Sequence, residues 1–293
     1  MSAVHIEGVS RSFSGRPVLR QVRAAAEPGK VVGLLGRNGE GKTTLLRILL
    51  DMLAADRGRV EVLGMMPDGS GAIRRHVGYV PERPAFHDFM SVAQVLDLRR
   101  RFFPHWNTDK AAGLCQRLGL DPAARVSSAS KGTLGKLAWV CAAAHEPELF
   151  LLDEPTSGLD ALVRDDLLSH LIEELHGKGK TFIIANHRME ELAGLLDEVW
   201  ALSDGALSVH QAEALRTGAR RVTGRLPRGG FLPAGLKARK VSQDGLLVEL
   251  AAFDEDAVQE AARSGLEDVH VEPLAFEQSL KILLLGEGGA GHD

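Results

Sequence analysis

Cysteine, net charge and long apolar segments are all scarce in this chain of 293 residues. Its two cysteines, Cys115 and Cys141, each lie in an apolar helical pattern, which favours buried free thiols over a disulfide or a metal-binding pair. Free thiols are typical of a reducing compartment. The net charge of −4 provides no strong general attraction to nucleic acid or to anionic lipid.

No segment of the sequence has the length and hydrophobicity of a membrane-spanning helix. Such a helix needs about 18 or more consecutive apolar residues, and the longest fully apolar run extends only from Leu137 to Ala144. The first ten residues lack the basic segment followed by an apolar segment that marks a secretory signal peptide. If the protein acts at a membrane, we expect another chain to cross it.

A glycine-rich segment, Gly36–Thr43, fits the phosphate-binding pattern GxxxxGK[ST] without a gap. It follows the apolar run Val31–Leu35 and precedes a helical pattern of leucines and isoleucines. In such a loop the backbone N–H groups, the helix N-terminus and the Lys42 ammonium attract phosphates, and the Thr43 hydroxyl can bind Mg²⁺. The sequence therefore predicts a site for a nucleoside triphosphate with magnesium; the alternative is a glycine-rich turn that binds nothing.

Two acidic residues follow a second apolar strand. Leu149–Leu152 is entirely apolar, and Asp153 and Glu154 come next, which is typical of a buried parallel strand that ends in carboxylates at the ligand-binding edge of a sheet. Asp153 can bind magnesium directly or through a water, and Glu154 can polarise a water for attack on the terminal phosphate. The structural alternative is that both acids cap the helix that starts near Asp160.

Two further candidates lie at the ends of strands. Phe13 precedes the turn Ser14–Pro17, where an aromatic ring either packs on the protein or stacks on a nucleotide base. His187 follows the strand Thr181–Ala185, where a histidine is either a surface residue or a catalytic group.

The alternation of strands and helices around the phosphate loop predicts a doubly wound α/β fold. Antiparallel strands precede the loop, at 4–9 and 18–24, and an all-α insertion occupies about 88–145. A hairpin at 198–210 closes the first domain, which we place at residues 1–218.

A small α+β extension is expected at residues 219–293. Strands at 246–250 and 268–272 flank a helix at 254–264, and a closing helix spans 276–285. Residues 286–293 are predicted to form a flexible tail. No catalytic cluster is recognisable in the extension.

In the order and spacing of these motifs, residues 3–212 resemble the nucleotide-binding subunit of ATP-binding cassette (ABC) transporters. Gly36–Thr43 resembles the Walker A motif, and Leu149–Glu154 resembles Walker B with its catalytic glutamate. Ser157–Asp160 matches the D-loop, and Ala129–Thr133 occupies the place of the LSGGQ signature, at the N-terminus of the helix that runs into Walker B. The resemblance implies a P-loop NTPase core of ABC type, with an antiparallel β subdomain and a helical insertion.

The same resemblance implies ATP and Mg²⁺ as cofactors and assigns roles to individual residues. Glu154 is the expected general base, Lys42 binds the phosphates, and His187 stands at the switch position near the γ-phosphate. The expected metal ligands are Thr43, Asp153 and Glu82. The expected nucleotide contacts are Phe13 at the adenine-stacking A-loop position, Gly36, Arg37, Asn38, Gly39, Glu40, Gly41, Lys42, Thr43, Thr44, Glu82, Ser130, Gly132 and Asp160.

The chain departs from the family pattern at two motifs. Glu82 stands where the family usually has the Q-loop glutamine, so one expected magnesium ligand is anionic. The signature keeps Ser130 and Gly132, whereas Lys131 and Thr133 replace the usual residues. The serine and the helix N-terminus that would face a γ-phosphate are retained.

The resemblance implies a working dimer, because two cassettes of this family enclose two ATP molecules and Ser130 would serve the nucleotide of a second copy. We expect a cytoplasmic ATPase subunit, bound to the inner face of the cell membrane, that energises transport through a separate integral-membrane permease, with export favoured. No nucleic-acid partner is expected. The alternatives are a soluble ABC ATPase that acts on ribosomes or DNA and an inactive regulatory cassette, which the presence of Lys42, Asp153, Glu154 and His187 disfavours.

Overall fold

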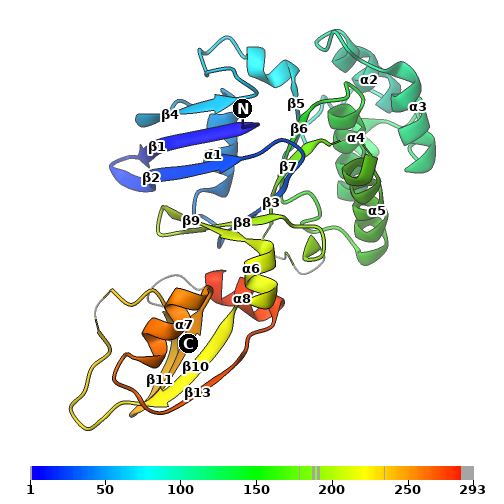
Figure 1. Ribbon diagram of the computed structural model, residues 1–293. Helices are drawn as coiled ribbons and strands as arrows, with labels where there is room; N and C mark the ends of the chain where they lie inside the picture. The colour runs from blue at the N-terminus through cyan, green and yellow to red at the C-terminus, as the bar shows by residue number, and fades with distance from the viewer. Residues whose placement is uncertain (1, 178, 187–188, 190–191, 234, 285–293) are drawn as a thin grey trace.

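The computed structural model describes residues 2–177, 179–186, 189, 192–233 and 235–284 (Figure 1). His187 and the tail at 286–293, for which sequence predictions were made above, lie outside these residues. Among the described residues, no helix is both long enough and apolar enough to cross a bilayer.

A six-stranded sheet forms the centre of the first domain, in the order β5-β6-β7-β3-β8-β9. Five of its strands run parallel, and β9 pairs antiparallel with β8. The residues of β3 and β6 are all buried, because layers of protein cover both faces of the sheet. The strands are β3 (Val31–Leu35), β5 (Val77–Val80), β6 (Leu149–Asp153), β7 (Thr181–Ala185), β8 (Glu198–Ser203) and β9 (Ala206–Gln211).

A three-stranded antiparallel sheet, β2-β1-β4, covers one face of the central sheet. It comprises β1 (Val4–Phe13), β2 (Arg16–Ala26) and β4 (Arg57–Val62), and its buried side chains share one hydrophobic core with helix α1 (Lys42–Leu49). β1 and β2 extend further than predicted, and Pro17 pairs with Ser12 inside the ladder. Pro17 is tolerated there because β2 is an edge strand.

Helices cover the opposite face of the central sheet (Figure 1). The stacked rings of Trp139, Phe150 and Phe182 anchor this second core, with ring centroids 5.4 and 4.6 Å apart. Cys115 and Cys141 lie buried in it as free thiols, which confirms their prediction. The elements here are α2 (Val92–Arg100), α3 (Thr108–Arg117), η2 (Val126–Ser128), α4 (Lys131–Ala143) and α5 (Ala161–Gly177), and the 3-10 turn η1 (Ala72–Arg75) precedes β5.

The C-terminal segment forms a third sheet, in the order β11-β12-β10-β13. Neither β10 nor β11 was predicted, because arginine, lysine and glycine interrupt the apolar alternation that identifies a strand. The last helix, α8, leaves this sheet and packs against α6 and against β3 and β8 of the first domain. The elements are α6 (Ala212–Thr217), β10 (Arg220–Arg225), β11 (Arg239–Asp244), β12 (Leu247–Ala252), α7 (Glu255–Ala262), β13 (Glu267–Pro273) and α8 (Phe276–Leu284).

The predicted fold class is confirmed: an α/β core with an antiparallel β subdomain and a helical insertion, followed by α+β structure. The carboxyl ends of β3, β6 and β7 meet at one edge of the central sheet, because these neighbours are parallel. Residues that follow these strands are therefore brought together.

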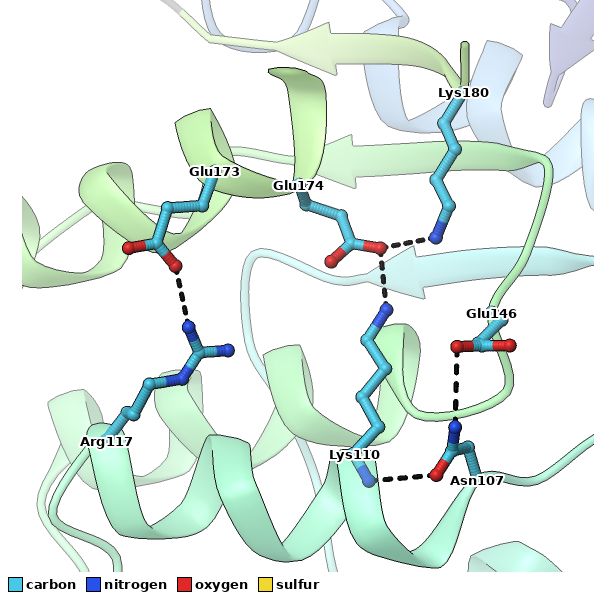
Figure 2. A network of polar contacts seen from close by, with 7 residues as sticks. All are labelled: Asn107, Lys110, Arg117, Glu146, Glu173, Glu174 and Lys180. Atoms are coloured by element: carbon cyan, nitrogen blue, oxygen red, sulfur yellow. Dashed lines mark hydrogen bonds and ion pairs between the residues drawn. The ribbon is translucent and has the colours of Figure 1, made fainter. Parts of the chain in front are cut away.

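A polar network joins the helical insertion to the central layer (Figure 2). Glu174 of α5 accepts hydrogen bonds from Lys110 of α3, at 2.7 Å, and from Lys180, which precedes β7. Burial tends to raise the pKa of the Glu174 carboxyl, but the hydrogen bonds and charges of the two lysines outweigh it, so this pKa lies below its usual value. Burial lowers the pKa of the Lys180 ammonium, although the hydrogen bond with Glu174 and its charge act in the opposite direction. The Glu174 carboxylate therefore offsets part of the cost of burying this positive charge.

We predict that Glu174→Gln lowers the free energy of unfolding at pH 7 by about 3 kcal/mol, because it leaves Lys180 and Lys110 without their anion. Because the folded-state pKa of Glu174 is depressed, the difference should persist above the unfolded glutamate pKa of about 4.3 and shrink as the pH falls below it. Glu173→Gln is the matched control, since Glu173 pairs with Arg117 at the exposed surface and should contribute at most about 1 kcal/mol. Equal decreases in the free energy of unfolding of the two variants, measured by urea denaturation, would contradict the role given to Glu174.

Candidate functional site

The glycine-rich segment Gly36–Thr43 connects β3 to α1, as predicted. Gly39 and Gly41 have φ angles of 88° and 106°, in the left-handed region that favours glycine. A Cβ atom on Gly41 would also lie 2.9 Å from Cγ1 of Val18. The loop can therefore enter the helix in this conformation only with glycine at these positions.

Lys42 and Glu154 converge behind the loop. The Lys42 ammonium donates hydrogen bonds to the carbonyl oxygens of Gly36, at 2.7 Å, and Arg37, at 3.4 Å. It also lies 3.2 Å from Oε1 of Glu154, and the two side chains are only 6% and 8% exposed. Two largely buried charges of opposite sign thus compensate each other at the edge of the sheet.

Asp153 is a buried carboxylate that feels the charges of two other acids, Glu154 and Glu82. Its side chain is 1% exposed, and burial raises the pKa of its carboxyl group, with further increases from the charges of Glu154 and Glu82. A hydrogen bond from Thr43 and the charge of Lys42 act in the opposite direction. Oδ1 of Asp153 has no hydrogen-bond partner within the described part of the chain. The Thr43 hydroxyl and the Asp153 carboxylate offer oxygen ligands of the kind that Mg²⁺ prefers together with phosphates, although the described residues form no cluster of three or more acidic, histidine or cysteine side chains that would hold a metal by themselves.

The backbone of Glu154 has a conformation that is uncommon for a residue other than glycine. Its φ is 50°, its N–H donates to the Ala185 carbonyl at 2.8 Å, and its own carbonyl accepts from the N–H of Ser157 at 3.0 Å. Non-glycine residues with positive φ cluster at functional sites, where the surrounding structure enforces them. Asp160, and not Asp153 or Glu154, caps α5, because its Oδ1 accepts a hydrogen bond from the Val163 N–H at 3.0 Å.

The remaining candidates around the loop differ in accessibility. Arg37 and Asn38 are exposed, and Thr44 is half-buried in the first turn of α1. Glu40 accepts a hydrogen bond from the Asp204 N–H at 2.7 Å and so ties the loop to the β8–β9 turn. Glu82 follows β5, and its side chain is half-exposed. Its Oε1 lies 3.9 Å from Nε of Arg83.

Phe13 ends β1 with a ring that is 44% exposed. The guanidinium of Arg11 lies over this ring, 4.9 Å from its centroid. A ring that packed wholly into the protein would be covered, so stacking on a base stays a prediction. The role predicted for His187 also remains a prediction.

The residues of the signature position lie away from Lys42. Ser130 is the N-cap of α4, and its hydroxyl accepts from the Thr133 N–H at 3.1 Å. A Cβ atom on Gly132 would lie 3.0 Å from Cγ1 of Val163. Helix α1 belongs to the core on one face of the central sheet, and α4 belongs to the core on the other face (Figure 1). The phosphate loop and the signature position of one chain therefore do not lie at the same nucleotide site.

Sequence reasoning gave no role to Tyr79 and Arg47, which adjoin this site. Burial and the nearby Asp153 carboxylate raise the pKa of Tyr79 to about 12, and Arg47 of α1 hydrogen bonds to its side chain. The sequence offered one indication of a role for Tyr79, namely its position within the strand that leads to Glu82. This pair connects the first helix to the strand that carries the Q-loop position.

Comparison with known proteins gives a consistent assignment. A family model described as "ABC transporter" matches residues 19–157. The chain is 31% identical over 205 residues to the ABC transporter ATP-binding protein YtrB of Bacillus subtilis, covering 70% of each chain. It is 34% identical over 212 residues to the Nod factor export ATP-binding protein I of Rhizobium etli, covering 70% of this chain and 66% of the relative. It is 35% identical over 215 residues to the Fe(3+) ions import ATP-binding protein FbpC 2 of Rhodococcus jostii, covering 70% and 61%.

Solved structures share the fold. One, described as an ATP binding subunit of an ABC transporter, superposes with a TM-score of 0.67 at 24% identity and covers 73% of this chain and 92% of its own. A dimeric ATP-binding cassette in a post-hydrolysis state with ADP and Pi gives a TM-score of 0.64 at 18% identity and covers 71% and 98%. With the phosphate loop, the acidic strand and the relatives in agreement, the chain belongs to the ABC transporter family as an ATP-binding subunit, an ATPase.

Proposed function

We propose that two copies of this protein bind Mg·ATP between them and hydrolyse it to drive export through a separate membrane permease. The observation that carries the proposal is the convergence of Lys42, Asp153 and Glu154 at one edge of the sheet, while Ser130 lies with the helices of the opposite face. A second copy supplies the missing signature. The relative named for dimeric assembly and the relatives named as transporter subunits support this arrangement.

Export is the favoured direction because the cassette carries a C-terminal extension of the kind that the resemblance associates with exporters, and one relative is named for export. Another relative is named for import, so transport into or out of membrane vesicles is the measurement that decides the direction. The permease would hold the protein at the cytoplasmic face of the cell membrane. Action on ribosomes or DNA is not favoured, because the relatives are named as transporter subunits.

Each polar residue has a definite task in this mechanism. Thr43, Asp153 and Glu82 would hold Mg²⁺, and the ion would neutralise charge on the phosphate oxygens. Lys42 exchanges its contacts with backbone carbonyls and Glu154 for contacts with the phosphates. Glu154, released from Lys42 but still fixed by its backbone, accepts a proton from the water whose oxygen bonds to the γ-phosphorus, while the bond from that phosphorus to the bridging oxygen breaks and ADP leaves. His187 contacts the γ-phosphate.

The assignment of Glu154 is tested by Glu154→Gln, which keeps the shape of the side chain but cannot accept the proton. We expect ATP hydrolysis to fall by about 10²- to 10⁴-fold, because general base catalysis is lost. Binding of ATP should be retained, and the variant should accumulate as an ATP-bound dimer in size-exclusion chromatography. Hydrolysis at the normal rate would refute the assignment.

Asp153→Asn tests the metal site through stability. Because burial raises the folded-state pKa of Asp153, its ionised form destabilises the ligand-free protein, and this effect grows as the pH rises through the unfolded pKa of about 3.9. At pH 7 the variant without ligand should therefore melt higher, by about 2–4 °C for a gain on the order of 1 kcal/mol. Mg·ATP should raise the melting temperature of the wild type much more than that of the variant. An equal shift in both would exclude Asp153 as a magnesium ligand.

A cavity beside Glu82 is our proposed contact surface for the permease. It has a volume of about 380 Å³ and lies within the first domain, between β5 and the helical insertion, lined by aromatic side chains that include Tyr79 and Phe86. Four arginines also line it, and no acidic residue does so in the described chain: Arg47, Arg74, Arg83 and Arg99. An apolar floor with a basic rim is complementary to an acidic, amphipathic segment of the permease.

Charge reversal tests this surface. Arg83→Glu combined with Arg99→Glu should reduce co-purification with the permease from detergent-solubilised membranes by about tenfold or more, because like charges oppose each other across the contact. The matched control reverses Arg100 and Arg101, which pair with Asp97 on the exposed side of α2. ATP hydrolysis by the isolated protein should stay unchanged in the control. Equal co-purification of the two double variants would place the permease elsewhere.

A further inference from the structure

The turn between β8 and β9 is fastened to the phosphate loop by one side chain of that loop. Oε2 of Glu40 accepts a hydrogen bond from the N–H of Asp204 at 2.7 Å. The two segments are neighbours because β3 and β8 are parallel and paired, so the loop that follows β3 and the turn that follows β8 leave the sheet at the same edge. Glu40 itself is half-buried and directly precedes Gly41 and Lys42.

The first residue of the loop rests on the end of β8. A Cβ atom on Gly36 would lie 3.0 Å from the carbonyl oxygen of Leu202 and 3.3 Å from Cγ of Lys42. A larger residue at this position would therefore push the loop away from β8 or displace the lysine stem. Gly36 and Glu40 thus hold both halves of the loop against β8 and the turn at 203–205.

Strand β2 is attached to the same turn. The N–H of Arg20 donates to the carbonyl oxygen of Gly205 at 2.7 Å. Gly205 and Gly41 both approach Val18 closely because they have no side chain. A Cβ atom on Gly205 would lie 3.0 Å from the Val18 carbonyl oxygen, and one on Gly41 would lie 2.9 Å from Cγ1 of Val18. The phosphate loop, the turn and β2 therefore meet in one junction, and β2 pairs with β1, which ends at Phe13.

The side chain of Glu40 has two opposite effects on a bound nucleotide. Its negative charge, in a loop that binds phosphates, repels an anionic ligand. Its hydrogen bond to Asp204 restricts the loop to a conformation in which Gly39 and Gly41 have positive φ angles. A loop held in its binding conformation before the ligand arrives binds more tightly, because the apparent affinity scales with the fraction of molecules in that conformation. An acid at this position favours binding only if the second effect exceeds the first.

We propose that Glu40 is a positioning residue for ATP binding: it fastens the phosphate loop to the turn at 203–205 and so keeps the loop in its binding conformation before the nucleotide arrives. The inference rests on the proposed binding of Mg·ATP at this loop. It differs from the expectation that Glu40 contacts the nucleotide, because the carboxylate is directed at the turn.

The test compares the binding of AMP-PNP, a non-hydrolysable analogue of ATP, in the presence of Mg²⁺ by the wild type, Glu40→Ala and Glu40→Gln, measured by isothermal titration calorimetry. The alanine variant should bind about tenfold more weakly, because without the hydrogen bond the free loop would adopt its binding conformation in only about a tenth of the molecules. The glutamine variant keeps an acceptor oxygen at the same reach and loses the charge, so it should bind as tightly as the wild type or up to about fivefold more tightly.

The two variants distinguish the hydrogen bond from the charge. If the carboxylate acted only through its charge, Glu40→Ala would bind as tightly as the wild type or more tightly, and the proposal would be overturned. It would also be overturned if Glu40→Gln lost as much affinity as Glu40→Ala, because the attachment to the turn would then not be the property that matters.

The rate of the chemical step should change much less than the affinity. At saturating ATP, single-turnover hydrolysis by Glu40→Ala should stay within about twofold of the wild type, because the bound phosphates then hold the loop. A normal affinity combined with a lower rate would place Glu40 in the hydrolytic step and overturn its role in binding.

Asp254→Ala is the matched control. Oδ1 of Asp254 also accepts one backbone N–H, that of Ala257, at 2.7 Å, but at the start of α7 in the C-terminal extension. Its replacement should lower the melting temperature, as the loss of an N-cap does, and leave the affinity for Mg·AMP-PNP unchanged. An equal loss of affinity in Glu40→Ala and Asp254→Ala would reduce the effect to general stability and overturn the proposal.

The wild type separates this inference from the proposed function. A wild-type protein that bound no Mg·AMP-PNP would refute the nucleotide site itself, and the present inference with it. Binding by the wild type that Glu40→Ala matches would overturn only the role of Glu40.

Discussion

The buried pair of Lys42 and Glu154 is the contact on which the nucleotide edge of this protein depends. Each charge is almost completely removed from water, and either one alone would be strongly destabilising. The pair forms only because the phosphate loop follows β3 and the acidic strand β6 lies two positions away in the same parallel sheet. The order of the strands therefore determines whether the charges of Lys42 and Glu154 can compensate each other. Their attraction in turn stabilises this order.

Asp153 adds an imbalance to this edge. The charges of Glu154 and Glu82 act on the Asp153 carboxylate in the same unfavourable direction, and the Lys42 ammonium acts against them. Burial is the main cause of the raised pKa of Asp153, and this excess negative charge adds to it. A divalent cation relieves it, so the same feature that weakens the ligand-free protein provides affinity for a metal nucleotide. Stability and function oppose each other at this one residue.

Much of this edge could be predicted from the sequence, because short-range patterns determine it. The glycine spacing of the phosphate loop and the apolar run before Asp153 identify strand ends, and parallel neighbours bring strand ends together. The capping role of Asp160 and the conformation of Glu154 were not predictable, because they depend on the path of the chain between β6 and α5. Strands β10 and β11 of the extension escaped prediction for another reason. Their stability comes from pairing within the sheet, and Gly224 fits because a larger residue would meet Leu266.

The two thiols provide a practical property of the molecule. Burial raises the pKa of Cys141 to about 12 and also raises that of Cys115, so almost no thiolate is present at neutral pH. Alkylating and oxidising reagents attack the thiolate, and both side chains are shielded from them as well. The natural chain is consequently a suitable background for spectroscopic probes: a single cysteine introduced at an exposed position could be labelled selectively, without first replacing the native ones.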